Sequence, residues 1–221
     1  MMLQVNVEQA RFNMIQQQIR PWEVLEQRVL DLMSDIPREN FVPTDYRNLA
    51  FADINIPLQH EQVMMFPKVE GRLLQALMLT SEDTVLEIGT GSAYMTALLA
   101  KLAKHVDSVD IFEDFVTEAE NKLKSLNINN VSLKTGDAIN GWNTDTQYDV
   151  IILTGAVPSL IDQFQSQLKE GGRLLAIVGE MQAAMQVRLI TRKNEYFHQD
   201  VLFETSLPPL LGAQTQNHFI F

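Results

Sequence analysis

Residues 85–94 read VLEIGTGSAY, and this segment says more about the architecture than any other part of the chain. An apolar run ends at Glu87 and Ile88, and a loop that contains Gly89 and Gly91 follows it. Glycine lets the backbone turn sharply and approach a ligand without a Cβ in the way. A helix that begins behind such a loop also offers unpaired N–H groups. The segment therefore predicts a strand, a ligand-binding loop and a helix in succession.

The loop differs from the two common phosphate-binding patterns. Dinucleotide-binding loops of the form G-x-G-x-x-G carry a third glycine that packs the helix against the strand, whereas Tyr94 occupies that position here. The Gly-Lys-Ser/Thr of a P-loop is also missing. The shortened loop fits a ligand without a pyrophosphate, such as S-adenosylmethionine (SAM). The alternative is that the two glycines only form a tight turn.

Short apolar runs and amphipathic patterns alternate after residue 84 and predict the fold class. Predicted strands cover 84–88, 106–109, 131–134, 150–153 and 173–178, and predicted helices cover 93–103, 113–126 and 159–168. Strands separated by helices of this length favour right-handed crossovers in a mostly parallel, doubly wound α/β sheet. Runs at 186–191 and 196–205 predict a C-terminal antiparallel hairpin. This is the layout of Rossmann-like SAM-dependent methyltransferases.

The first third of the chain has a different pattern. Apolar spacing predicts helix over residues 8–35, divided by Pro21 and closed by Pro37. Residues 41–67 are expected to form an ordered loop with short strands, and residues 68–79 to return to helix. We therefore expect one methyltransferase domain over 1–221, in which an N-terminal helical and loop extension (1–80) covers a SAM-binding core (81–221).

Composition limits the classes of function. The 221 residues contain no cysteine, which excludes a disulfide scaffold and a thiolate metal site, and no spacing of His, Asp or Glu predicts any other metal site. The formal net charge of -11 disfavours nucleic acid as a partner because phosphates would be repelled. No apolar run approaches the length of a membrane span, so no membrane association and a cytoplasmic location are expected.

Two acidic positions extend the predicted SAM site. Asp110 ends the second strand about 20 residues beyond the glycine loop, where a carboxylate can accept hydrogen bonds from both ribose hydroxyls. Asp137 follows the third strand and can face the adenine amino group. Each has a plain structural alternative, a polar strand end for the first and a turn for the second. Their order along the chain is what favours a cofactor site.

The chain resembles the protein-L-isoaspartate O-methyltransferases, which use SAM to methylate the misplaced carboxylate of isoaspartyl residues. The resemblance lies in IPRENFVP (36–43), FAD (51–53), the glycine loop, GW (141–142) and QLKEGGRL (167–174). It implies a peptide or protein substrate with isoaspartyl residues. It also implies a set of residues around SAM: Glu87, Gly89, Thr90, Gly91, Ser92, Asp110, Asp137 and Ala138.

The acceptor end departs from the family pattern. The family carries a segment like Thr-Ile-Ser-Gln-Pro, whose serine lies beside the acceptor carboxylate. Aligned on its proline, this chain has Val63, Met64, Met65 and Pro67 as the predicted substrate-binding residues, and Met65 takes the place of the serine at the catalytic position. A thioether cannot donate a hydrogen bond. Two alternatives therefore stay open, which are a methyltransferase for a different small-molecule acceptor and a non-catalytic SAM-binding protein.

Overall fold

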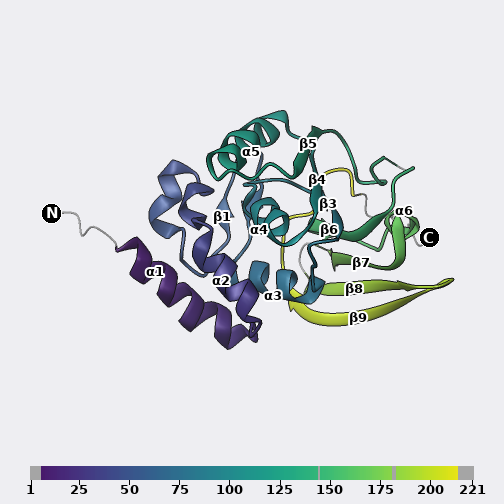
Figure 1. Ribbon diagram of the computed structural model, residues 1–221, viewed down its shortest axis with the longest axis horizontal. Coiled ribbons are helices and arrows are strands. Elements are labelled where there is room, and N and C mark those ends of the chain that lie inside the picture. The colour runs from purple at the N-terminus through teal and green to yellow at the C-terminus, as the bar shows by residue number, and fades with distance from the viewer. Residues whose placement is uncertain (1–5, 144, 181–182, 214–221) are drawn as a thin grey trace, which may run out of the picture.

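A computed structural model describes residues 6–143, 145–180 and 183–213 and confirms the predicted α/β class. Its main element is a seven-stranded sheet of order β5-β4-β3-β6-β7-β8-β9 (Figure 1). The two ends of the predicted domain, 1–5 and 214–221, lie outside the described residues. Within the described part, every helix is too short or too polar to reach across a lipid bilayer.

The strands agree with the predicted topology. Neighbouring strands from β5 through β7 run parallel, β8 is antiparallel to β7, and β9 is antiparallel to β8, which confirms the C-terminal hairpin. The strand bounds are β3 Thr84–Ile88, β4 His105–Asp110, β5 Val131–Thr135, β6 Tyr148–Val157, β7 Leu168–Val178, β8 Met185–Lys193 and β9 Tyr196–Thr205.

The crossover helices are α4 (Tyr94–Leu102), α5 (Glu113–Ser125) and α6 (Asp162–Ser166). The first two match the predicted helices closely. The predicted helix over 159–168 is wrong in length, because only five residues are helical and Leu168 already belongs to β7. Leu168 is fully buried and pairs with Tyr148 of β6, so burial against the sheet overrides the helical spacing of the segment.

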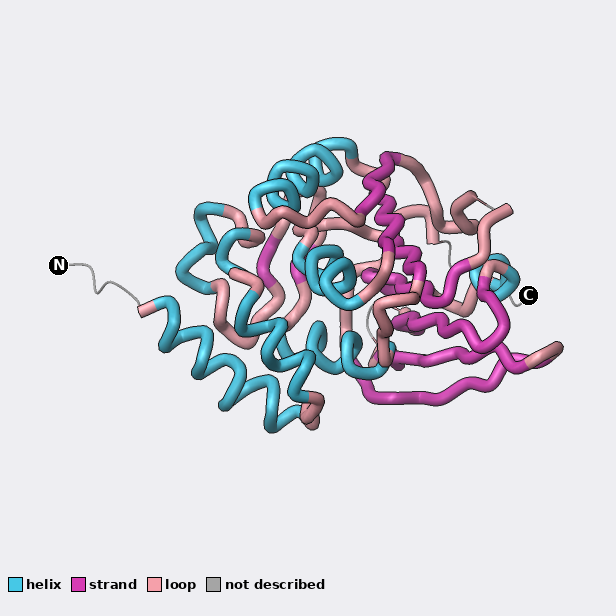
Figure 2. Tube along the Cα trace, in the orientation of Figure 1, coloured by secondary structure: helices cyan, strands magenta, loops and turns pink. Residues whose placement is uncertain are grey.

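The N-terminal segment forms helices at one end of the molecule, on the left in Figures 1 and 2. Pro21 lies in a single 3₁₀ turn, and the helical region divides there as predicted. The hairpin of β1 and β2 confirms the short strands expected in 41–67. The bounds are α1 Val7–Met14, η1 Ile15–Ile19, η2 Arg20–Trp22, α2 Gln27–Asp35, η3 Arg38–Asn40, η4 Thr44–Leu49, β1 Ile56–Pro57, β2 Val63–Met64 and α3 Pro67–Leu77.

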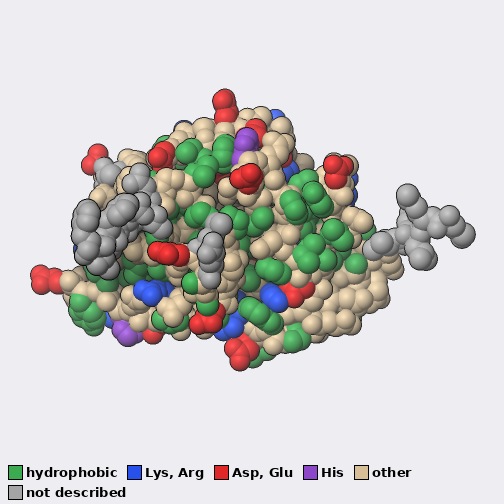
Figure 3. Space-filling model, turned by 180° about the vertical axis from the view of Figure 1, so that it is seen from behind, with side chains coloured by type: hydrophobic (Ala, Val, Ile, Leu, Met, Phe, Trp, Pro, Cys, Tyr) green, Lys and Arg blue, Asp and Glu red, His purple; other side chains and the backbone are tan. Residues whose placement is uncertain are grey.

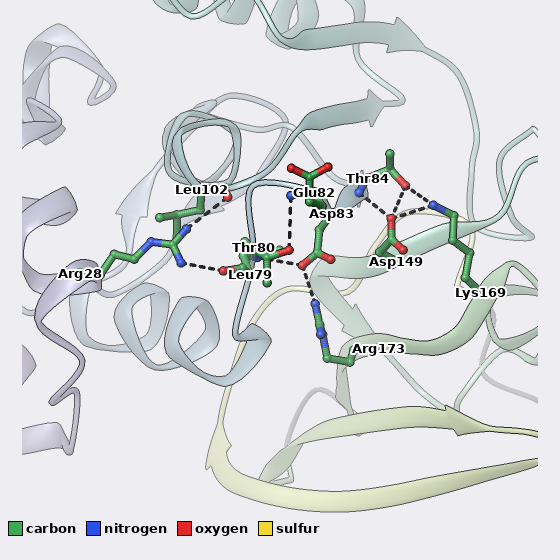
Figure 4. Close-up of polar contacts among 10 residues, drawn as sticks. All are labelled: Arg28, Leu79, Thr80, Glu82, Asp83, Thr84, Leu102, Asp149, Lys169 and Arg173. Carbon is green, nitrogen blue, oxygen red and sulfur yellow. Dashed lines mark hydrogen bonds and ion pairs between the residues drawn. The ribbon is translucent and has the colours of Figure 1, made fainter.

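Polar contacts lie between the extension and α4 and at the amino ends of the central strands (Figure 4). Arg28 of α2 donates to the carbonyl oxygens of Leu79 (2.8 Å) and Leu102 (3.2 Å). Asp149 of β6 accepts from the backbone N–H of Thr84 at 2.8 Å. The extension and the sheet also share one hydrophobic core. The opposite, carboxyl edge of the sheet is left to form the site.

Candidate active site

A cleft lies at the carboxyl ends of β3, β4, β5 and β6. The chain builds outward from β3 to β5 and then returns to place β6 on the other side of β3. Ligands of open α/β sheets bind where the strand order reverses in this way. The residues that line it include Met64, Met65, Glu70, Gly89, Thr90, Gly91, Ser92, Asp110, Phe112, Asp137, Ala138, Thr154 and Leu210.

The loop after β3 needs glycine for two reasons. Gly89 has φ of 101°, which L side chains rarely adopt. A Cβ at Gly89 would also lie 2.4 Å from Oγ1 of Thr154. That hydroxyl donates to the carbonyl oxygens of Ile88 (2.9 Å) and Gly89, so β6 holds the loop in place. The predicted loop residues 89–92 all line the cleft.

Asp110 ends β4 beside the loop, as predicted. Its Oδ2 accepts from the backbone N–H of Gly91 at 2.8 Å, and its Oδ1 accepts from that of Phe112 at 3.0 Å. Only 7% of the residue is exposed, and this burial raises the pKa of its carboxyl above the usual value. Each carboxylate oxygen has a further lone pair, so a ligand in the cleft can still donate to Asp110.

Asp137 and Ala138, two of the residues predicted around SAM, line the cleft from the loop after β5. Oδ1 of Asp137 accepts from the backbone N–H of Ile139 at 3.0 Å, which fixes the carboxylate at the start of the loop. Trp142 supports the same loop, since a Cβ at Gly136 would lie 2.8 Å from its ring. The carboxyl ends of β4 and β5 therefore present two carboxylates to one cavity.

Glu87 differs from its predicted position, because it is fully buried and does not line the cleft. Its Oε2 accepts from the hydroxyls of Thr96 on α4 and Ser108 on β4, both at 2.6 Å. Ser108 in turn shares a 2.7 Å hydrogen bond with the hydroxyl of Thr90. Burial raises the pKa of Glu87 to about 8. Glu87 thus supports the glycine loop through Ser108 and Thr90 and does not line the cleft.

Val63, Met64 and Met65, which were predicted to bind the substrate, line the cleft from the N-terminal extension. Pro67 does not, because it is the first residue of α3 and is buried. Sequence reasoning missed Glu70, which also lines the cleft and pairs with Arg38. No local signal identifies Glu70, because its partner comes from another element.

A C-terminal segment forms a further wall that the sequence did not predict. The backbone N–H of Ala156 donates to Pro208 (3.0 Å), and that of Leu210 donates to Ala156 (2.9 Å). These bonds hold the segment against β6, so that Leu210 and Leu211 line the cleft. The only available signal was the apolar run of residues 207–211 after the last strand.

The charges around the cleft fit SAM. Within the described part of the chain, three of the lining residues are acidic (Glu70, Asp110 and Asp137) and none is Lys or Arg. Such a lining repels phosphate groups and favours a ligand with positive charge and hydroxyl donors. SAM carries a sulfonium, an amino group and ribose hydroxyls, so the residues present suit it.

Comparison with known proteins identifies the family of the chain. The family model for protein-L-isoaspartate(D-aspartate) O-methyltransferase matches residues 9–215. The chain belongs to this family. Among its relatives, the protein-L-isoaspartate O-methyltransferase of Aliivibrio fischeri is 34% identical over 93% of this chain and 98% of its own length. That of Rhodopseudomonas palustris is 36% identical, with 91% and 93% covered. Family members are methyltransferases that use SAM.

Solved structures share the fold. One protein-L-isoaspartate O-methyltransferase superposes with a TM-score of 0.75 at 24% identity, covering 90% of this chain and 65% of that one. A Plasmodium falciparum structure, described as a protein-L-isoaspartate O-methyltransferase in complex with S-adenosyl-L-homocysteine, gives a TM-score of 0.74 at 18% identity, with 93% and 98% covered. Both likenesses confirm the predicted Rossmann-like methyltransferase architecture.

Proposed function

We propose that this chain transfers a methyl group from SAM to the carboxylate of isoaspartyl residues in peptides or proteins. The observation that carries the proposal is the shared cleft. The glycine loop, Asp110 and Asp137 line it from the core, and we call their part the cofactor end. Met64 and Met65 line the same cleft from the N-terminal extension, and we call their part the acceptor end. A donor site and an acceptor site that open into one cavity are what a group transfer requires.

The cofactor end would hold SAM through residues of three strand ends. The loop 89–92 lets the backbone approach the ligand, Asp110 accepts hydrogen bonds from hydroxyls, and Asp137 with Ala138 closes the far side. When bound, SAM supplies a methyl group on a positively charged sulfur. Glu87 keeps the loop in shape through Ser108 and Thr90. Glu87 is therefore a positioning residue, because it acts through the loop.

The acceptor end works by orientation and by exclusion of water. A carboxylate is ionised near neutral pH, so the reaction needs no general base. Met65 is buried and contributes an apolar wall without a hydrogen-bond donor. The acceptor must therefore be aligned by other groups than the family serine.

The test is the transfer of radiolabelled methyl from SAM to an isoaspartyl peptide, with its aspartyl twin as control. The proposal predicts label on the isoaspartyl peptide alone. A Met65→Ser variant, which restores the hydroxyl, is assayed in parallel. Label on neither peptide, although SAM binds, would refute the isoaspartyl assignment, and label that requires the serine variant would place the cause at Met65.

One observation favours a second candidate acceptor. Met64 and Met65 give the acceptor end of the cleft an apolar lining, which suits a small apolar acceptor in place of a peptide. Nucleic acid is not part of the proposal because the net charge is -11, and acidic side chains stand out at several places on the face in Figure 3. We include a cytoplasmic location, with which the absence of cysteine agrees.

A further inference from the structure

Glu70 is a buried carboxyl group at the acceptor end of the cleft. It belongs to the first turn of α3 and lines the cavity together with Met64 and Met65. Its side chain is only 2% exposed. A buried carboxyl needs partners for both oxygens, because an unpaired buried polar atom is costly.

Among the residues that the structure describes, only one of the two oxygens has a hydrogen-bond partner. Arg38 donates from Nη1 to Oε2 of Glu70. The other nitrogens of Arg38 are engaged, since Nε donates to Ala50 O at 2.9 Å and Nη2 to Met65 O at 2.7 Å. Arg38 is thereby fixed in place. Within the described part of the chain, no hydrogen bond reaches Oε1 of Glu70.

The ionisable groups that face Glu70 come from two other elements. Arg38 belongs to η3, and Tyr94 belongs to α4 and lies with its ring 4.8 Å below the Arg38 guanidinium. Burial raises the pKa of Glu70 to about 7, an effect larger than the opposing attraction of Arg38. Near neutral pH, Glu70 therefore changes readily between a neutral and an ionised form.

Resting on the proposed function, we infer that Glu70 contacts the methyl acceptor and, as a neutral carboxyl group, donates a hydrogen bond from Oε1 to the acceptor carboxylate. Arg38 contributes one positive charge and the acceptor one negative charge, so this arrangement leaves no net charge buried. An ionised Glu70 would repel the acceptor. The neutral group supplies the donor that the thioether of Met65 lacks.

The inference has a direct consequence for the proton balance of binding. Above the pKa of Glu70, the acceptor can bind well only if Glu70 takes a proton from solvent. No covalent bond other than that O–H bond forms or breaks in this step. The KM for an isoaspartyl peptide should therefore rise with pH by up to about tenfold per pH unit above about pH 7.

The first experiment measures KM for the isoaspartyl peptide from about pH 6 to about pH 9. Wild-type protein is compared with Glu70→Gln, whose amide donates at every pH, and with Glu82→Gln, an exposed carboxyl outside the cleft. We expect a rising KM for wild type and Glu82→Gln, and a flat one for Glu70→Gln. All three proteins should still bind SAM.

A second measurement needs no variant and so does not depend on how Glu70→Gln folds. Calorimetry of peptide binding to the wild-type protein with S-adenosyl-L-homocysteine, in two buffers of different ionisation enthalpy, counts protons. At about pH 8 we expect an uptake of about one proton per peptide. Peptide binding without proton uptake, or labelling with a pH-independent KM, would overturn the inference about Glu70 and leave the proposed function standing. A protein that binds SAM but neither binds nor labels the peptide would overturn the proposed function as well.

Discussion

The imidazole of His60 stacks on the ring of Phe112, with centroids 3.8 Å apart and planes 6° from parallel. His60 lies in the loop between β1 and β2, and Phe112 follows the end of β4 at the edge of the cleft. Nε2 of His60 also lies 2.8 Å from Oδ2 of Asp114. The stack therefore ties the N-terminal extension to the core beside the cofactor end of the cleft.

His60→Ala should weaken SAM binding. An aromatic stack of this kind contributes about 0.5–1.5 kcal/mol, and without it the β1–β2 loop loses a contact that holds it at the cleft. We expect a dissociation constant a few-fold higher, measured by calorimetry. His198→Ala serves as the control, because His198 is an exposed residue on β9 whose only polar partner among the described residues is Asp200. Equal SAM affinity of the His60 variant and wild type would contradict this role.

Gly89→Ala should damage the loop far more than Gly91→Ala. A Cβ at Gly89 would lie 2.4 Å from Thr154, and alanine rarely adopts the φ of 101° at this position. A Cβ at Gly91 would lie 3.6 Å from Leu58, which is an ordinary contact. At φ of 50°, Gly91→Ala costs about 1–2 kcal/mol. Thermal melting and SAM titration of both variants check the order. The predicted order is wrong if the Gly91 variant is the more impaired of the two.

Stability should fall as pH rises because Glu87 is buried. Its folded pKa is raised from 4.5 to about 8. The associated stability is therefore complete below about pH 4.5 and is lost between there and about pH 8. Within that window the expected slope is about 1.4 kcal/mol per pH unit at most. Denaturant unfolding of wild type, Glu87→Gln and the exposed control Glu82→Gln measures it. As pH rises, Glu87→Gln should lose less stability than wild type. Identical pH profiles for these two proteins would disprove the role assigned to Glu87.

Met78→Gly should stabilise the protein. Met78 ends α3 in a left-handed conformation, with φ of 46°, and is 62% exposed. Glycine adopts this conformation without a Cβ penalty, and little packing is lost, so a gain of roughly 0.5–1 kcal/mol is expected. Met78→Ala is the control because it keeps the Cβ. The prediction is checked by thermal unfolding and is wrong if the glycine variant is no more stable than the alanine variant.

The parts of the fold that local patterns encode were predictable. The segment 84–102 combines an apolar run, a glycine loop and a helical spacing, and it forms β3, the loop and α4 as predicted. The early start of β7 was not predictable, because Leu168 fits the helical spacing of 159–168 and only its pairing with Tyr148 extends the strand. The domain division at residue 80 stays a prediction.

The site was predictable where residues lie at strand ends. Asp110 ends β4 and Asp137 follows β5, and parallel strands bring such positions together. Glu87 lies within β3, and its burial depends on the hydroxyls of Thr96 and Ser108 from two other elements. Glu70 depends on Arg38, which is 32 residues away in the sequence. Contacts of this kind leave no local pattern.

We expect this cleft to bind SAM through the ends of β3 and β4. A calorimetric titration of SAM into three proteins tests this most directly. These are wild type, Asp110→Ala and Glu120→Gln, the last being an exposed carboxyl on α5. We expect binding by wild type and Glu120→Gln, and affinity about tenfold to hundredfold lower for Asp110→Ala, since hydrogen bonds to a charged group contribute about 1.5–3 kcal/mol. Absence of binding by the wild-type protein, or equal affinity for the folded Asp110 variant, would contradict the account.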